Sequence, residues 1–256
     1  MNRRPVVGVS LKAYLGLQDT LKWAKDAAEL VGKHPAVDSG TVEFIVFPST
    51  PFLSVVNQLF DGTKGVVGAQ DVSQMGPGAF TGENVAEHLR DVGTQYVAIG
   101  HAERKSHFFE DGPIINRKLG RAVEAGLAPL LCVGEDDNIG VVAGAEVCIR
   151  QIDDALGVKG SHSVPGSLIV AYEPVWAIGA EEPAPEHHVL GVFDHIRRHL
   201  DRLGGEQARV VYGGSAGPGL IRRISPPLDG LFLGRFAHDV KNLVKVLDES
   251  VLVESE

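Results

Sequence analysis

The stretch Ala171-Tyr172-Glu173-Pro174-Val175-Trp176-Ala177-Ile178-Gly179 decides how the chain is interpreted. It continues a short uncharged run, residues 167–171, whose branched apolar side chains are typical of a buried strand. Glu173 therefore stands at the carboxyl end of a buried strand, where an α/β barrel keeps its catalytic groups. Pro174 stiffens the loop that follows, and Trp176 gives this loop an apolar side chain to bury when it closes. Taken alone, Glu173 could equally be a strand-end residue that caps the next turn.

The rest of the chain repeats one pattern, a short apolar run followed by a helical pattern. Eight such units predict an all-parallel sheet covered by helices, and eight strands close a barrel that side chains fill. The prediction is an α/β fold, one (β/α)8 TIM-barrel domain over residues 1–256. A doubly wound open sheet is the alternative, but no G-x-G-x-x-G follows the first strand. The predicted strands are 5–10, 43–48, 66–70, 96–100, 128–132, 167–172, 209–213 and 230–234. The predicted helices are 16–33, 51–60, 83–90, 112–125, 142–155, 185–204, 217–224 and 238–248.

Composition narrows the class of protein. The chain has 256 residues, a formal net charge of −9 and a pI of about 5.6, which argues against nucleic-acid binding. No apolar run approaches the length of a membrane span, and the two cysteines suggest neither disulfides nor a zinc site. We therefore expect a cytoplasmic protein without a membrane partner. An anionic substrate would need local donors, because the overall charge repels it.

Polar and backbone-exposing residues follow the predicted strands. They are Lys12, His101, Glu173, the run Gly213-Gly214-Ser215, and Gly234. Loops after barrel strands converge on one face, so these residues should meet in space. A lysine there would stabilise a phosphate or an enolate. A histidine beside a helix N-terminus is favoured as the neutral imidazole, which donates a hydrogen bond to a carbonyl.

Two glycine-rich turns follow the seventh and eighth predicted strands. The run Tyr212-Gly213-Gly214-Ser215 opens a predicted helix, and Gly234 ends the last strand. Paired glycines let backbone amides face an anion, and barrels commonly bind phosphate between these two loops. We expect a phosphate site there. By contrast, the histidine pairs 187–188 and 195/199 are interpreted as a solvated helix face and not as metal ligands.

Taken together, the chain resembles the triosephosphate isomerases over nearly its whole length. The resemblance implies that Glu173 removes a carbon-bound proton, His101 polarises the carbonyl, Lys12 stabilises the negative charge and Glu103 supports the site. It also implies that the loop 174–182 closes over the substrate, and that no metal or organic cofactor takes part. The matching segments are Lys12, residues 70–83, 98–101, Glu103-Arg104, 132–135, 172–179 and 212–215.

The resemblance also implies the binding groups and the assembly. Backbone amides around Gly179, Ser215 and Gly234 would hold the phosphate. Residues 70–83 resemble a loop that docks into a second subunit, with Thr81 near the partner's active site, so a homodimer is expected. The predicted substrate-binding set is completed by Ser10, Lys12, Tyr212, Gly214 and Arg235.

Four positions depart from the family pattern. Ser10 stands where the family has Asn, Ala102 where it has Ser, 180–182 read Ala-Glu-Glu where it has Thr-Gly-Lys, and Arg235 replaces a glycine. Asn to Ser deletes volume beside the reacting carbons, which would admit one more hydroxymethyl group.

The expected reaction is the interconversion of dihydroxyacetone phosphate and glyceraldehyde 3-phosphate through an enediol. The alternative is the same chemistry on a tetrulose phosphate such as L-erythrulose 1-phosphate. A barrel that only binds sugar phosphate is disfavoured, because Lys12, His101 and Glu173 are all present.

Overall fold

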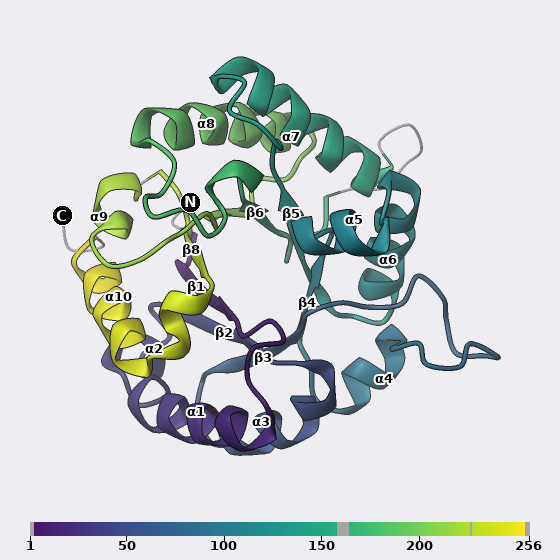
Figure 1. The fold of residues 1–256 in the computed structure, drawn as a ribbon, viewed down its shortest axis with the longest axis vertical. Helices are drawn as coiled ribbons and strands as arrows, with labels where there is room; N and C mark the ends of the chain where they lie inside the picture. Colours follow the sequence, from purple (N-terminus) through teal and green to yellow (C-terminus); the bar gives the residue numbers. More distant parts are fainter. Residues whose placement is uncertain (1–2, 158–163, 226, 254–256) are drawn as a thin grey trace.

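Eight parallel strands close into one barrel in chain order (Figure 1). The computed structural model describes residues 3–157, 164–225 and 227–253. Every strand lies within its predicted range or extends one residue beyond it, so the barrel prediction is confirmed. The strands are β1 (Val6–Ser10), β2 (Glu43–Phe47), β3 (Val66–Ala69), β4 (Tyr96–Ile99), β5 (Ala128–Val133), β6 (Ile169–Tyr172), β7 (Arg209–Tyr212) and β8 (Gly230–Leu233).

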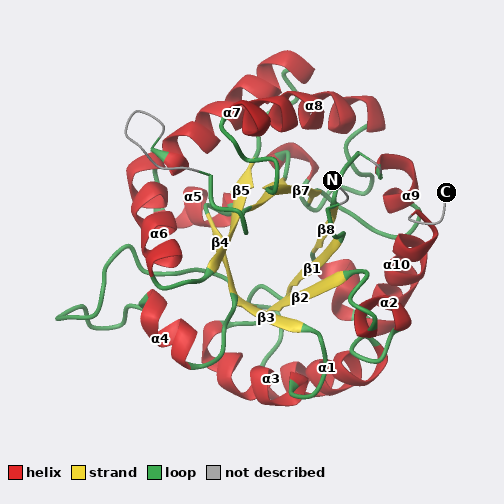
Figure 2. Cartoon of the chain, turned by 180° about the vertical axis from the view of Figure 1, so that it is seen from behind, coloured by secondary structure: helices red, strands yellow, loops and turns green. Residues whose placement is uncertain are grey.

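Helices surround the barrel as an outer ring, which is visible from both sides (Figures 1 and 2). None of the described helices combines the length and apolar composition needed to cross a membrane. The helices are α1 (Leu17–Leu30), α2 (Pro35–Asp38), α3 (Leu53–Phe60), α4 (Ala86–Asp91), α5 (Ala102–Phe108), α6 (Gly112–Glu124), α7 (Val141–Leu156), α8 (Glu186–Arg202), α9 (Leu220–Ile224) and α10 (Val240–Val253). The described residues also form short 3-10 turns, η1 (Thr50–Phe52), η2 (Val175–Ala177) and η3 (Arg235–His238).

Two helices, α2 and α5, lie where none was predicted. Both are too short for a helical period to be visible in the sequence. Each begins after a histidine, His34 or His101, whose ring nitrogen accepts a hydrogen bond from the first turn. Two predicted helices begin later than expected, α4 at Ala86 and α9 at Leu220.

The alternation of side chains along each strand decides which residues point into the barrel at the carboxyl ends of the strands. Val6 belongs to the cluster inside the barrel, whereas Val7 and Val9 pack outward against the helices. Period-two alternation therefore turns Ser10 inward at the carboxyl end of β1. By the same counting, Ile169 and Ala171 point inward and place Glu173 inward after β6.

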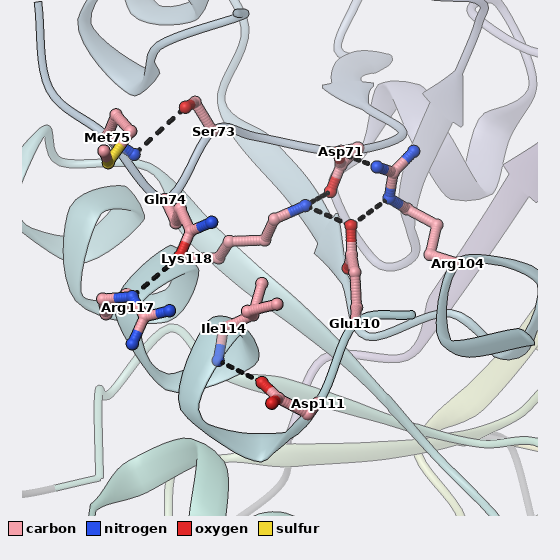
Figure 3. A network of polar contacts seen from close by, with 10 residues as sticks. All are labelled: Asp71, Ser73, Gln74, Met75, Arg104, Glu110, Asp111, Ile114, Arg117 and Lys118. Carbon is pink, nitrogen blue, oxygen red and sulfur yellow. Dashed lines mark hydrogen bonds and ion pairs between the residues drawn. The ribbon is translucent and has the colours of Figure 1, made fainter. Parts of the chain in front are cut away.

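The loop between β3 and α4 projects far from the barrel (Figures 1 and 2). A network of four charged residues fixes its base (Figure 3). Asp71, from the loop, contacts Arg104 of α5 at 2.9 Å and Lys118 of α6 at 2.6 Å. Glu110 bonds both cations, at 2.6 Å from Arg104. The network joins the projecting loop to α5, the helix that follows His101.

Candidate active site

A cavity of about 670 Å³ lies at the carboxyl ends of the strands. Ser10, Lys12, His101, Glu103 and Glu173 all line it. They come from the ends of β1, β4 and β6, so the structure brings together the residues that the sequence placed at strand ends. The remaining lining comes from residues 178–183, in and just after the lid (residues 174–182), from Tyr14, from the loop after β7 and α9, and from the end of β8 with the residues that follow it.

Glu173 presents a buried carboxylate with one oxygen unused. The residue is 5% exposed, and its backbone N–H donates to the Val133 carbonyl at 2.8 Å. Oε2 is buried and has no hydrogen-bond partner among the described residues. Nε2 of His101 lies 3.9 Å from Oε2. A buried carboxylate oxygen without a donor is unfavourable, so this oxygen is suited to taking a proton from a bound molecule.

His101 is held by the helix that it caps. Its Nδ1 accepts a hydrogen bond from the backbone N–H of Glu103 at 3.2 Å, so Nδ1 carries no proton. The neutral ring then has its hydrogen on Nε2, the nitrogen nearer Glu173. In this arrangement Nε2 can donate a hydrogen bond to a molecule bound in the cavity.

Lys12 adopts a left-handed backbone conformation, with φ of 48°. Its carbonyl accepts hydrogen bonds from Ser49 Oγ at 2.8 Å and Gln70 Nε2 at 2.9 Å, which hold this loop in place. The ammonium contacts Glu103 Oε1 at 2.6 Å. Burial pushes the pKa of Glu103 upward, but the hydrogen bond from Lys12, together with the positive charge nearby, outweighs burial and holds the pKa below its usual range. Glu103 thereby keeps its charge and orients the lysine.

Cys132 lies beside Glu173 and was not predicted as part of the site. Burial, and then the charge of Glu173, raise the pKa of its thiol well above the usual range. The residue therefore stays a neutral thiol beside the carboxylate. Strand alternation could have found it, because Leu130 and Cys132 both point into the barrel.

Two hydrogen bonds join the lid and the residues just after it to the end of β7 and to the loop that follows β7. Ser215 Oγ donates to the Ala180 carbonyl, and the Ala184 N–H donates to the Tyr212 hydroxyl, both at 2.9 Å. Tyr212, predicted to bind substrate, is fully buried and does not line the cavity, and its hydroxyl is bonded to the Ala184 N–H. Gly214 does not line the cavity either. It packs against the Tyr212 side chain so closely that a Cβ at position 214 would lie 2.5 Å from the hydroxyl oxygen.

The glycine run after β7 does not open a helix, contrary to the prediction. Residues 213–217 form a loop, and α9 begins only at Leu220, after Gly219 with φ of 82°. Pro218 and Gly219 delay the helix, so a helix dipole does not act at the run. Gly213, Ser215 and Gly234 nevertheless line the cavity, as does Gly179 of the lid.

Arg235 reaches from the end of β8 toward the lid. Its guanidinium carbon lies 5.7 Å from the ring centre of Tyr14, and one terminal nitrogen would be 3.8 Å from a Cβ on Gly179. Tyr14 also lines the cavity and was not predicted. The acidic lid residues Glu181 and Glu182 line the same cavity, as does Arg223 of α9.

Thr81 lies apart from these residues. It is exposed in the loop between β3 and α4 and does not line the cavity of its own chain.

The family model described as triosephosphate isomerase matches residues 5–250. The chain belongs to the triosephosphate isomerase family. It is 40% identical, over all of its length and 99% of the relative's, to L-erythrulose-1-phosphate isomerase of Pectobacterium atrosepticum. It is 37% identical to triosephosphate isomerase of Klebsiella pneumoniae, over 74% of this chain and 76% of that protein. It is 32% identical to triosephosphate isomerase of Thermoanaerobacter pseudethanolicus, over 96% of this chain and 99% of that protein.

The fold matches a solved member of the triosephosphate isomerase family. The crystal structure of triosephosphate isomerase from Bartonella henselae superposes with a TM-score of 0.83, at 24% identity, over 99% of this chain and 100% of that one. Three of the four departures from the family pattern, at Ser10, residues 180–182 and Arg235, line the cavity. Ala102 does not line it.

Proposed function

We propose that the protein is a cofactor-independent sugar-phosphate isomerase that moves a proton between adjacent carbons through an enediol. The observation that carries the proposal is the free Oε2 of Glu173, which is buried in the cavity 3.9 Å from the donor nitrogen of His101. A base and a hydrogen-bond donor at this spacing match a carbon acid and its neighbouring carbonyl oxygen.

The chemistry follows from these positions. Glu173 removes the proton from the carbon next to the ketone, and the electron pair moves onto the carbonyl oxygen. His101 donates its Nε2 hydrogen to that oxygen and helps to move a proton between the two enediol oxygens. Lys12, oriented by Glu103, stabilises the negative charge. Return of the proton to the neighbouring carbon completes the isomerisation.

The phosphate is proposed to lie under the lid. Gly179, Ser215 and Gly234 line this part of the cavity, so their backbone amides would be the phosphate donors, and Arg235 would add a guanidinium suited to two-point binding of a phosphate. The lid bonds to Ser215 and Tyr212 would exclude water while the enediol exists.

L-erythrulose 1-phosphate is the proposed preferred substrate. It equals dihydroxyacetone phosphate with a hydroxymethyl group added to the carbon that loses its proton. The full-length 40% identity to an enzyme named for this sugar supports it, and Ser10 leaves room for the added group. Dihydroxyacetone phosphate is the second candidate, because several other relatives are named triosephosphate isomerase.

The test is turnover of both sugars by the purified protein. We expect both to react, with the larger kcat/KM for L-erythrulose 1-phosphate. A larger kcat/KM for dihydroxyacetone phosphate would reverse the substrate order. Binding of either sugar without turnover would instead make the protein a non-catalytic sugar-phosphate-binding barrel.

The working form is proposed to be a cytoplasmic homodimer in which the whole chain, 1–256, acts as one domain. The projecting loop carries exposed apolar side chains, Met75 and Phe80, and Phe109 after α5 is 82% exposed. Docking of the loop into a second copy would bury them and bring Thr81 near the partner's cavity. Sedimentation should give a dimer for the purified protein and a monomer for Phe80→Asp.

A further inference from the structure

A buried carboxylate, Glu135, joins the two ends of the lid. It follows β5 and is 1% exposed. Its Oε1 accepts three hydrogen bonds, from Tyr172 Oη at 3.0 Å, Trp176 Nε1 at 3.0 Å and His188 Nε2 at 2.9 Å. Trp176 lies at the start of the lid, and His188 lies in the first turn of α8, directly after the lid ends.

His188 is not on a solvated helix face, which corrects the interpretation from the sequence. It is 3% exposed, and its ring packs edge-on against the Trp176 ring with centres 5.4 Å apart. Because Glu135 Oε1 is an acceptor, Nε2 of His188 is the donor. The histidine thus contacts the first part of the lid both directly and through the carboxylate.

The other neighbours of Glu135 leave it dependent on these donors. Its Oε2 lies 4.0 Å from Cys148 Sγ of α7, a weak donor at most. Burial, and then the charge of Glu135, raise the pKa of Tyr172 above its usual range, so Tyr172 remains a neutral donor. A buried carboxylate that loses one of three donors must find another or shift.

A displacement of Glu135 would also displace Glu173, the proposed catalytic base. Tyr172 directly precedes Glu173, and the backbone N–H of Val175 donates to the Glu135 carbonyl at 2.9 Å. Both residues next to the Glu173-Pro174 segment are therefore bonded to Glu135. Movement of Glu135 would displace Glu173 relative to His101, and displacements of about 1 Å at a reacting group cost about 100-fold in rate.

We propose that His188 is a positioning residue, which through Glu135 fixes both ends of the lid and the orientation of Glu173. The role rests on the proposed isomerase function. His188 touches no reacting atom, since it does not line the cavity.

The test compares three variants of His188. Gln places an amide N–H close to where Nε2 of histidine lies, Asn keeps the polarity but its amide falls short, and Leu removes the donor. We expect Leu and Asn to lower kcat and kcat/KM equally, by about 10- to 100-fold, because the transition state alone needs the exact base position. Gln should stay within about threefold of the wild type. If Leu does not fold, Asn makes the same comparison.

Tryptophan emission provides a readout that does not depend on turnover. The chain has two tryptophans, and Trp23 is buried in α1 with its N–H bonded to the Ala237 carbonyl. A red shift in His188→Leu or His188→Asn, absent in His188→Gln, would report loosening at Trp176. His34→Leu is the matched control, since His34 is also buried and bonds Asp248 at 3.0 Å far from the cavity. It should lower the melting temperature without changing kcat or the emission maximum.

Two results would overturn the proposal. One is a kcat within threefold of the wild type in both His188→Leu and His188→Asn. The other is an equal loss in all three variants with unchanged emission, which would show that the imidazole ring matters only for packing. If the wild type isomerises neither sugar phosphate, the proposed function fails, while the emission comparison still decides whether His188 holds the lid.

Discussion

Gly213 leaves no space for a side chain beside Glu173. A Cβ at position 213 would lie 2.5 Å from Glu173 Cγ and 2.6 Å from Oε1. The last residue before the glycine run, Tyr212, pairs with Tyr172, which precedes Glu173. The register between β6 and β7 therefore places Glu173 directly against the backbone of Gly213. This contact limits the directions in which the Glu173 carboxylate can point.

Gly213→Ala should displace the Glu173 carboxylate and lower kcat by about 10- to 100-fold, because misplacement of a reacting group by about 1 Å has an effect of that size. Steady-state kinetics measure it. Gly217→Ala is the matched control, since a Cβ there would meet only Phe236, at an ordinary 3.8 Å. Equal kcat for Gly213→Ala and Gly217→Ala would show that the close approach does not orient the base.

Tyr212→Phe should weaken the lid without removing any group from the cavity. The Ala184 N–H is buried and would lose its acceptor, at a cost of about 1–3 kcal/mol. We therefore expect kcat/KM to fall by about 5- to 150-fold. Tyr96→Phe is the control, because that buried tyrosine bonds Glu43 at the opposite end of the barrel. It should reduce stability and leave kcat/KM unchanged; equal kinetic losses in the two variants would remove the lid explanation.

Ser10→Asn should change the choice of substrate. Ser10 ends β1 facing the cavity, and a larger side chain there would compete with the additional hydroxymethyl group of a tetrulose phosphate. Exclusion of one small group is worth about 1–3 kcal/mol, so the ratio of the two kcat/KM values should move about 10- to 200-fold toward dihydroxyacetone phosphate. Ser10→Ala adds no bulk and should leave the ratio unchanged. A shift toward the tetrulose in Ser10→Asn would contradict the pocket assignment.

The Lys12–Glu103 pair predicts a dependence of stability on acid pH. The pKa of Glu103 is lower in the folded protein than its ordinary value of 4.5, so its contribution to stability is complete above pH 4.5. The contribution is lost as the pH falls through the folded-state pKa. Because Glu103 is nearly half exposed, we expect less than about 1 kcal/mol. The stabilities of wild type and Glu103→Gln from urea unfolding should therefore converge as the pH falls below 4.5; a difference that grows toward acid pH would contradict the pairing.

The strands and their end residues were predictable because buried parallel strands have a simple signature. Uncharged runs such as 167–172 and 209–213 stand out, and the barrel then brings Lys12, His101 and Glu173 to one face. The helices were less predictable where they are short. α5 has seven residues, and its start depends on the His101 cap, which only the structure reveals.

Roles that depend on side-chain direction were not predictable from the sequence. Tyr212 belongs to the glycine-rich run but turns away from the cavity, where it bonds the lid instead of a substrate. His188 stands among four helix histidines that look alike in the sequence, and its partner Glu135 is 53 residues away. Neither distinction follows from spacing, because each depends on which elements pack together across the barrel.

The central claim is that Glu173 removes a carbon-bound proton, and isotope exchange in D2O tests it most directly. Wild type and Glu173→Gln are each incubated with L-erythrulose 1-phosphate, and NMR follows deuterium entering at the carbon next to the carbonyl. Gln keeps the size of the side chain but not its basicity, so the exchange rate should fall about 10²- to 10⁴-fold. Exchange at the wild-type rate in Glu173→Gln would contradict the account, because another group would then be the base.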